Sequence, residues 1–520
     1  MVEASSTSIP HNLIPKLHTP FFLLQYADDT LIFATARGQA IKTLLLVLKA
    51  FSQVSGLRLN WNKTSFVPFN LNDNAISSIE SLLSCSKSSL PLTYLGLPLT
   101  ASRPSRLCFQ QLIDKIRGRL MGWQSNFLSK AGRTVLTTSV LSSIPVFFMS
   151  VFTLPKWVIK EIDRIRRNFI WKGNSGGGNG IHLVAWDRLC LPKSVGGLGL
   201  IDLGSQNVSL LLRWLWRLHT CPDSQWTSLI KQLYGKRSTA LPMFWNQSGS
   251  FFWRDLMSLR LYFQLSTTHE IRDGATTSFW FQRWERSHLS YFGNNLQKHP
   301  LMNRRNVHMT VQDAVKRPHS FLQSPFTADV CTFVSKAQNL ILNQGTDEIQ
   351  WRWSSDGQFS VSSTYKGLIL PGKTSFKYSN LWKLKIPPSL KHFLYYMSLG
   401  RILTQDQLLK RGIQVNAHCY MCSQDCLEDA NHLFCDCVLA RDVWLSLQIP
   451  PMVTADLASI CGALHSQFSG LSTFNKVTIC SALWSIWKER NCRIFRNKRR
   501  NCQALHDWIV QEATLFMKWC

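Results

Sequence analysis

The sequence predicts an α+β protein in which a few short strands and many helices form several domains. Two patterns lead to this prediction. Short apolar runs flank the acidic pair Asp28-Asp29, as in a β-hairpin, whereas residues 38–54, 106–120 and 155–171 repeat apolar side chains at helical spacing. With 520 residues, of which 45% are hydrophobic, the chain is long enough for several domains with their own cores.

The charge balance indicates a polyanionic partner. Lys and Arg total 58 against 30 Asp and Glu, which gives a net charge of +28. Because bound phosphates release their counterions, nucleic acid is the favoured polyanion, and an acidic membrane surface is the alternative.

Cysteine usage and the termini indicate a reducing compartment. The fifteen cysteines are an odd number, and five of them crowd between Cys419 and Cys437, unlike a secreted disulfide scaffold. The N-terminus lacks the basic region and apolar core of a signal peptide. The uncharged stretch between Arg133 and Lys156 is interrupted by hydroxyl side chains and Pro145, so we expect buried helix packing there and no membrane span. The expected location is the nucleus and cytoplasm.

Asp28 and Asp29 form the first candidate site. The apolar runs at 21–25 and 30–33 predict two buried strands, with Ala27, Asp28 and Asp29 at the turn. Neighbouring carboxylates repel each other and resist burial, so they need a cation, and hard oxygen ligands favour Mg²⁺. For an Asp-Asp pair considered alone, a solvated acidic turn is the alternative.

The stretch Tyr26-Ala27-Asp28-Asp29 resembles the Tyr-x-Asp-Asp signature of reverse transcriptases, whose carboxylates bind the metal ions of nucleotidyl transfer. Residues 55–63 resemble the family's next palm motif, and residues 92–99 resemble its primer-grip turn. The resemblance implies a catalytic role for Asp28, Asp29 and Lys63, with Mg²⁺ as cofactor. It also implies that residues 1–100 are the C-terminal part of a polymerase palm. Considered alone, Lys63 would be a solvated surface lysine.

Residues 155–171 predict an amphipathic helix on which Lys160, Arg164 and Arg167 share one face, away from the apolar stripe. Such a basic stripe is usually a solvated face, but beside the palm motifs contact with duplex phosphates is favoured. The motif at 128–133 resembles the thumb of plant LINE-type (non-LTR) retrotransposon polymerases. This resemblance implies a helical thumb over residues 101–172.

The high Gly and Asn content of residues 173–180 predicts a flexible linker. The following segment, residues 181–346, is a mostly helical connector rich in tryptophan. Aromatic side chains beside arginines could stack on unpaired bases, but the favoured interpretation is that they form a hydrophobic core.

The spacing Cys419-x2-Cys422-x9-His432-x4-Cys437 predicts a structural Zn²⁺ site, because a Cys-x2-Cys turn aims two thiolates at one ion and a His/Cys pair completes a tetrahedron. Cys435 is a reserve ligand, with Cys426 nearby, and reduced thiols on loops are the alternative. Residues 347–446 resemble the zinc-binding domain downstream of the polymerase in plant LINE-type elements. There the cysteine at the fifth position after the histidine is the ligand, which implies Cys437.

Residues 447–520 predict a basic helical C-terminal region. A phosphate-contacting arm, a nuclear-import patch and a solvated helix remain open for it. Its basic stretch contains Glu489 as the one acid among the cations Lys488, Arg490, Arg493, Arg496, Lys498, Arg499 and Arg500.

The resemblance implies an RNA-directed DNA polymerase with RNA and DNA as template-primer partners and no membrane. Two-metal nucleotidyl transfer requires a further carboxylate from a separate strand. In reverse transcriptases that strand lies upstream, and Glu3 is the one acid before Tyr26. We therefore expect a truncated polymerase that is inactive alone. The alternative is a non-catalytic, zinc-containing RNA/DNA-binding remnant of a retrotransposon.

Overall fold

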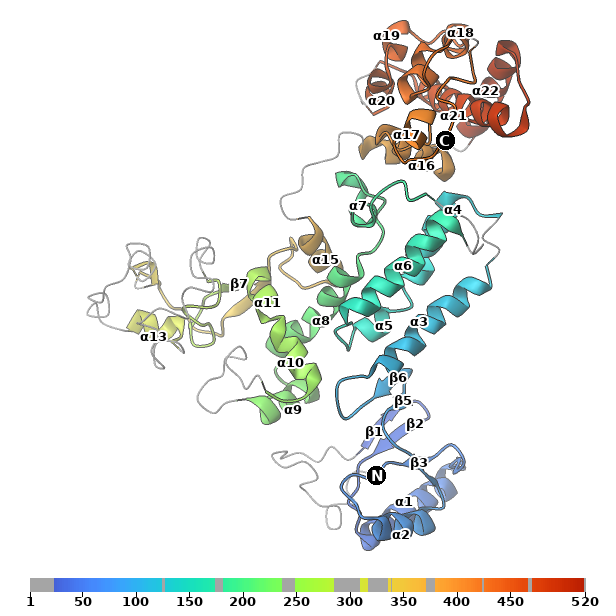
Figure 1. The fold of residues 1–520 in the computed structure, drawn as a ribbon. Coiled ribbons are helices and arrows are strands. Elements are labelled where there is room, and N and C mark those ends of the chain that lie inside the picture. The colour runs from blue at the N-terminus through green and yellow to red at the C-terminus, as the bar shows by residue number, and fades with distance from the viewer. Residues whose placement is uncertain are drawn as a thin grey trace. The chain divides into compact units, whose positions relative to one another are not determined.

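The computed structural model describes residues 23–518 apart from 124–126, 174–180, 236–247, 285–308, 317–334, 338, 371–378, 423–424 and 466–469. Within these residues helices predominate, and the strands form four two-stranded sheets (Figure 1). This composition agrees with the expected α+β class. The chain divides into two compact units: residues 1–112, 147–154 and 206–368 form the first, and residues 113–146, 155–205 and 369–520 form the second.

The first unit combines the sheets with a group of short helices. Its elements are β1 (Leu23–Tyr26), β2 (Asp29–Ile32), α1 (Gly38–Ser55), β3 (Ser65–Phe66), α2 (Asp73–Leu83), β4 (Ser86–Lys87), β5 (Leu92–Tyr94), β6 (Leu97–Leu99), α5 (Val146–Met149), most of α8 (Leu203–Thr220), α9 (Gln225–Tyr234), α10 (Phe251–Ser258), α11 (Arg260–Ser266), β7 (Thr267–Glu270), α13 (Val311–Lys316), β8 (Glu348–Trp351) and α15 (Val361–Ile369).

The described elements of the second unit are helical. They comprise most of α3 (Arg106–Met121), α4 (Lys130–Leu136), the π-helix η2 (Thr137–Leu141), α6 (Lys156–Lys172), α7 (Trp186–Cys190), the 3₁₀-helices η3 (Lys193–Val195) and η8 (Ser379–Lys383), α16 (Pro388–Ser398), α17 (Gln405–Leu409), the π-helix η9 (His432–Asp436), α18 (Val438–Ser446), α19 (Pro451–Thr454), α20 (Leu457–His465), α21 (Thr473–Arg496) and α22 (Cys502–Met517).

Strands β1 and β2 form the expected hairpin. They pair antiparallel with Tyr26 opposite Asp29, which leaves Ala27 and Asp28 as a two-residue turn. Ala27 has φ 51°, because such tight hairpin turns need a left-handed residue. The expectation of buried strands is wrong: Leu23 is 46% exposed. Two paired strands cannot bury both of their faces, and no further strand joins this sheet among the described residues.

Helices α3 and α6 occupy the ranges expected from their periodicity. The apolar stripe of α6, which includes Val158, Ile162 and Phe169, is buried as predicted. The uncharged segment before α6 forms η2 and α5, and Leu141 and Met149 there are fully buried, in agreement with helix packing. No helix among the described residues is both long and apolar enough to cross a membrane. The expected linker lies outside the described residues from position 174 onward.

Tryptophan side chains form much of the first unit's core. Trp216, Trp253 and Trp351 are buried in one cluster with the side chains of α8, α10 and α11. Trp351 reaches this cluster because β8 pairs antiparallel with β7, with Trp351 opposite Thr267. These residues support the core interpretation of the tryptophans.

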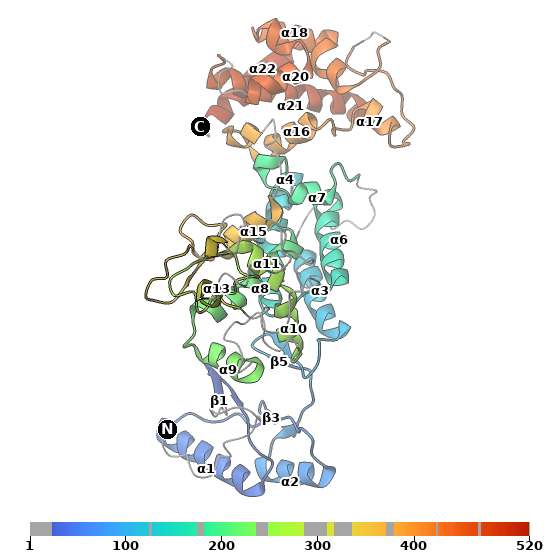
Figure 2. The same cartoon turned by 90° about the vertical axis from the view of Figure 1, so that its left-hand side faces the viewer.

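A large hydrophobic core joins the C-terminal helices of the second unit. Side chains of α16, η9, α18, α20, α21 and α22 meet there, including the fully buried Leu433, Ile486 and Leu505. Helices α21 and α22 lie side by side in both views (Figures 1 and 2). The boundaries of the compact units differ from those of the expected segments. Residues 348–351 of the expected zinc-binding segment pair with β7 in the first unit. Residues 447–518, expected as a separate region, share a core with the rest of the zinc-binding segment.

Candidate metal centre and basic surfaces

Four side chains with metal-ligating atoms come together in the second unit. One ligand atom from each of Cys419, Cys422, His432 and Cys437 lies within 4.8 Å of the others. The Sγ atom of Cys422 and the Nε2 atom of His432 are 3.6 Å apart. In the part of the chain that the structure describes, this is the one group of three or more His, Cys, Asp or Glu side chains that could hold a metal ion.

The size and chemistry of this group fit a structural zinc ion. With Zn–S bonds of about 2.3 Å, the ligand atoms of a tetrahedron lie about 3.8 Å apart. The ligand atoms lie at most 4.8 Å from one another, so the most distant pair would have to approach by about 1 Å to bind the same ion. Three sulfur atoms and one imidazole nitrogen fill all four positions, so the site is closed to water and substrate.

A small hairpin positions the first two thiols. The N–H of Cys419 donates to the carbonyl oxygen of Cys426 at 2.9 Å, and the N–H of Glu428 donates to that of Ala417 at 2.8 Å. Inside the turn, the N–H of Met421 donates to the Sγ atom of Cys419 at 3.3 Å. Hydrogen bonds from backbone amides to sulfur favour its thiolate form, which is the form that binds metal.

The π-helix η9 brings His432 and Cys437 to the same side. Its wider turn lets the N–H of Cys437 donate to the carbonyl oxygen of His432 at 2.7 Å. The carboxylate of Asp429 fixes the start of this turn by accepting the N–H of His432 at 2.7 Å. Cys437 then precedes α18, and the N–H groups of Leu439 and Ala440 donate to its sulfur.

Cys419 and Cys437 interact through a shared proton. The thiol of Cys419 donates a hydrogen bond to the sulfur of Cys437, which lowers the pKa of Cys437 and, together with burial, raises the pKa of Cys419. A Zn²⁺ ion held between them stabilises both as thiolates, so its binding releases this proton.

The reserve ligand Cys435 lies outside the group of four. Its side chain is buried, and burial raises its pKa to about 12, which keeps it a neutral thiol. Cys426 is also outside the group, and its carbonyl oxygen holds Cys419 in the hairpin. Every cysteine that the structure describes is a free thiol.

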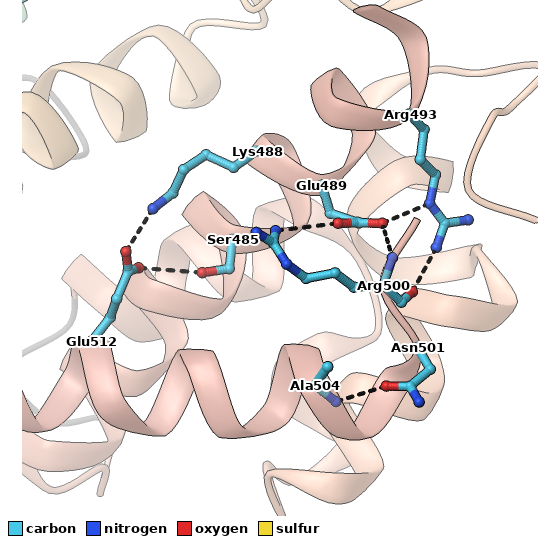
Figure 3. Close-up of polar contacts among 8 residues, drawn as sticks. All are labelled: Ser485, Lys488, Glu489, Arg493, Arg500, Asn501, Ala504 and Glu512. Carbon is cyan, nitrogen blue, oxygen red and sulfur yellow. Dashed lines mark hydrogen bonds and ion pairs between the residues drawn. The ribbon is translucent and has the colours of Figure 1, made fainter. Parts of the chain in front are cut away.

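Arg493 connects the Cys-x2-Cys turn to α21. Its Nη1 donates to the carbonyl oxygen of Met421 at 2.8 Å, and its Nε donates to Oε1 of Glu489 at 2.9 Å. Glu489 is fully buried and also accepts the N–H of Arg500 at 2.8 Å (Figure 3). Sequence reasoning missed this role of Glu489, because nothing in the local pattern marks the acid as buried.

A second buried ion pair joins the hairpin to α21. The guanidinium of Arg490 donates to Glu428 from Nε at 3.0 Å and from Nη2 at 2.6 Å. Both side chains are almost fully buried, and Glu428 also accepts the N–H of Gln405 at 3.1 Å. These contacts hold α17, the hairpin and α21 together around the metal-ligating group.

Asp28 and Asp29 are exposed at the tip of the β1–β2 hairpin. Among the described residues, the structure brings no third carboxylate, histidine or cysteine to them. Lys63 is also exposed and lies in a turn, where its N–H donates to the carbonyl oxygen of Asn60 at 3.1 Å.

The basic stripe of α6 is partly neutralised. Lys160 and Arg164 are exposed and Arg167 is half-buried. Glu161 accepts two 2.8 Å hydrogen bonds from Arg164 and one of 2.6 Å from Arg117, and these arginines lower its pKa to about 2. The sequence contained a signal for this pairing, since Glu161 precedes Arg164 by three residues on a helix.

The sequence is similar to that of one protein family and of two plant proteins. Residues 359–444, which contain all four ligating side chains, match a family described as zinc-binding in reverse transcriptase. A protein of Arabidopsis thaliana named "Putative ribonuclease H protein" is 28% identical over 368 residues, which are 67% of this chain and 57% of that protein. An uncharacterized mitochondrial protein of the same plant is 30% identical over 143 residues, 27% of this chain and 92% of that protein. The chain thus spans little more than half of the first relative.

Proposed function

This chain is a retrotransposon reverse transcriptase-related protein. From this premise we propose that it is encoded by a plant LINE-type (non-LTR) element and that it binds RNA and DNA. The observation that carries this proposal is the Cys/His group within residues 359–444, because it links the folded geometry to a reverse transcriptase module. The net charge of +28 supplies the attraction to phosphates. The proposed sites of action are the nucleus and the cytoplasm.

In this proposal zinc has a structural role. Cys419, Cys422, His432 and Cys437 are its ligands, and all four coordination positions come from the protein. The ion therefore stabilises the hairpin, η9 and the start of α18 relative to one another, and it leaves no open position for chemistry.

The thumb-like region, residues 101–172, is proposed to contact the backbone of a template-primer. Lys160 has an exposed ammonium group on α6. Arg164 donates to Glu161 through Nε and Nη2, so Glu161 fixes the orientation of the guanidinium. The other N–H donors of this exposed guanidinium remain available to a phosphate. Arg167 lies one helical turn further along. Together these side chains present donors along one face of the helix, as a phosphate backbone requires.

The catalytic part of the proposal concerns the β1–β2 hairpin. Asp28 lies in the two-residue turn and Asp29 is the first residue of β2, and the oxygen atoms of both exposed side chains can bind Mg²⁺. Bound Mg²⁺ would stabilise the charge that develops on a nucleoside triphosphate during transfer. Lys63 is proposed to face the triphosphate. By resemblance the chain is an RNA-directed DNA polymerase with Asp28 and Asp29 indispensable, and the expectation that it is inactive alone is tested by primer extension.

A second candidate function is nucleic-acid binding without catalysis. The observation that favours it is the isolation of the carboxylate pair, since the described residues bring no third metal-ligating group to Asp28 and Asp29. Two-metal transfer requires carboxylates from more than one strand.

Primer extension on an RNA template with Mg²⁺ separates the two candidates. The full chain is compared with an Asp28→Ala, Asp29→Ala double variant, whose exposed hairpin tip should fold unchanged. Extension that disappears in the double variant supports the polymerase. If neither protein extends the primer while both bind RNA with strong salt dependence, the non-catalytic function holds. Absence of RNA binding by the parent protein even at low salt contradicts both.

A further inference from the structure

The turn between α21 and α22 is a short, well-defined loop. Helix α21 ends at Arg496, and Asn497 caps it with φ 48°, a left-handed conformation that Asn tolerates. Helix α22 starts after Asn501, whose side-chain oxygen accepts the N–H of Ala504 at 2.9 Å. Both ends of the turn therefore have a capping asparagine, and Figure 3 shows the hydrogen bond of Asn501.

The buried carboxylate of Glu489 orders this turn through hydrogen bonds. Its Oε1 accepts both the N–H of Arg500 and the Nε–H of Arg493, and Arg493 in turn donates to the carbonyl oxygen of Arg500 at 3.1 Å (Figure 3). The guanidinium of Arg500 also lies over the ring of Trp508, 4.2 Å from its centre. The backbone of the turn is thus ordered without any partner.

The charges of the turn divide into a paired and an unpaired set. Arg490 is neutralised by Glu428, and Glu489 binds both Arg493 and Arg500. The side chains of Arg496, Lys498 and Arg499 are exposed, and no residue that the structure describes forms a hydrogen bond or ion pair with them. These three cations, which we call the turn cations, therefore remain available to an external anion.

An aromatic ring lies beside the turn cations. Phe495, in the last turn of α21, is 77% exposed although the rest of the helix buries most of its apolar side chains. An exposed ring next to several cations is the combination by which proteins bind single-stranded nucleic acid, with bases stacked on the ring and phosphates held by the cations.

We propose that the α21–α22 turn binds single-stranded nucleic acid, with backbone phosphates on the turn cations and one unpaired base stacked on Phe495. The proposal rests on the proposed nucleic-acid-binding function and names a second contact surface for it, separate from α6. A duplex would not present a free base face to the ring, so the site favours single strands. Glu489 and Arg493 are positioning residues, because they fix the turn and the metal-binding hairpin to the same helix.

The test of the turn cations measures binding of the full chain to a short oligouridylate over a series of salt concentrations. The variant Arg496→Gln, Lys498→Gln, Arg499→Gln is compared with Lys42→Gln, Lys49→Gln, Lys87→Gln, which removes three exposed cations from the first unit. Each lost phosphate contact lowers the logarithmic salt slope by about 0.7 for a single strand, so the turn variant should show a slope flatter by about 2. The control variant should keep the parent slope.

The test of the ring uses Phe495→Leu, which keeps an apolar side chain but loses the stacking surface. Oligouridylate binding should weaken by about fivefold or more, whereas binding to a duplex of equal length should not change. Thermal unfolding should also stay unchanged, because the ring is mostly exposed.

Three results would overturn the inference. Equal salt slopes for the turn variant and the control, with the parent still binding RNA, would reject this surface and leave the proposed function standing. Unchanged RNA binding by Phe495→Leu with loss of self-association in sedimentation would assign the ring to a protein interface. Absence of parent binding at low salt would reject the proposed function and the inference together.

Discussion

The guanidinium of Arg493 donates a 2.8 Å hydrogen bond to the carbonyl oxygen of Met421, between the two cysteines of the Cys-x2-Cys turn. The same guanidinium is held by the buried carboxylate of Glu489. A residue of α21 thereby fixes the geometry of a hairpin more than 70 residues earlier in the chain. The helix and the metal centre therefore stabilise each other, and this coupling can be measured.

The first prediction is that Arg493→Met lowers zinc affinity without removing a ligand. The substitution keeps much of the side-chain volume but frees the Met421 carbonyl, so the thiols of Cys419 and Cys422 are less well oriented. Loss of such an outer contact typically reduces metal affinity by about 10-fold to 100-fold. Competition with a chromogenic chelator gives the affinity, and Lys518→Met, which removes an exposed cation from the same unit, is the control. Equal affinities for the two variants would show that the contact does not orient the ligands.

The second prediction distinguishes the two candidate fourth ligands. The parent chain should contain about one zinc ion, Cys437→Ser should lose it, and Cys435→Ser should retain it, because four-coordinate sites need all their ligands. Elemental analysis of the purified proteins measures the content. Zinc in Cys437→Ser together with its loss from Cys435→Ser would assign the site to the reserve ligand.

Removal of the metal extends the same prediction to stability. Since ligand binding and folding are coupled, a strong chelator should lower the unfolding temperature of the parent and of Cys435→Ser. The transition of Cys437→Ser, which starts without zinc, should not respond. An unchanged transition in the parent would mean that the ion does not support the second unit.

The third prediction concerns the buried pair of Glu428 and Arg490. Glu428→Gln leaves the arginine charge buried and unpaired, so the free energy of unfolding should fall by about 3–5 kcal/mol. Glu348→Gln breaks the exposed pair with Arg272 and should cost at most about 1 kcal/mol. Urea denaturation followed by tryptophan fluorescence measures both changes.

A double variant tests whether the unpaired charge is the cause. In the double variant Glu428→Leu, Arg490→Leu no charge remains buried, so most of the free energy of unfolding lost in Glu428→Gln should be recovered. The N–H of Gln405 then has no acceptor, which costs about 1–3 kcal/mol. If the double variant were less stable than Glu428→Gln, the packing of these side chains would matter more than their charge.

Local patterns were enough to predict several parts of this molecule. The four ligating side chains lie within nineteen residues of sequence, so short turns suffice to bring them together. The Tyr26–Asp29 hairpin and helix α6 likewise follow from nearest-neighbour periodicity and from their turn or capping residues. For each of these elements, the residues that indicate its local geometry lie within a short window of sequence.

The rest depends on partners that a short window does not contain. Glu428 meets Arg490 across 62 positions, and β8 pairs with β7 across about 80, and no spacing rule specifies such partners. Burial of β1 and β2 was expected from their apolar residues. Hydrophobicity shows that a strand can be covered but not what covers it: the residues of β1 are exposed, and those of β2 are exposed or half-buried.

The last prediction is a loss of stability in the first unit on mild acidification, carried by His269. Its side chain is buried in strand β7, and its Nε2 has no hydrogen-bond partner among the described residues. Burial, with a smaller electrostatic effect from the nearby His219, lowers its pKa from 6.5 to about 3, although Asp347 opposes this. Between these two values the unfolded chain binds a proton that the folded chain excludes. Stability should therefore fall as the pH drops below about 6.5, by up to about 1.4 kcal/mol per pH unit for this residue.

His269→Gln removes this titration and should flatten the pH dependence of unfolding between about pH 6.5 and 4. His506→Gln, in the second unit, should retain the parent slope. Hydrogen exchange of the β7–β8 segment assigns the effect to the first unit, because the backbone amides of that sheet are protected only while it is folded. His219, whose pKa burial lowers to about 4, should leave a residual slope in His269→Gln. A parent slope identical to that of His269→Gln would mean that His269 gains its proton without unfolding the sheet, and that its surroundings admit water.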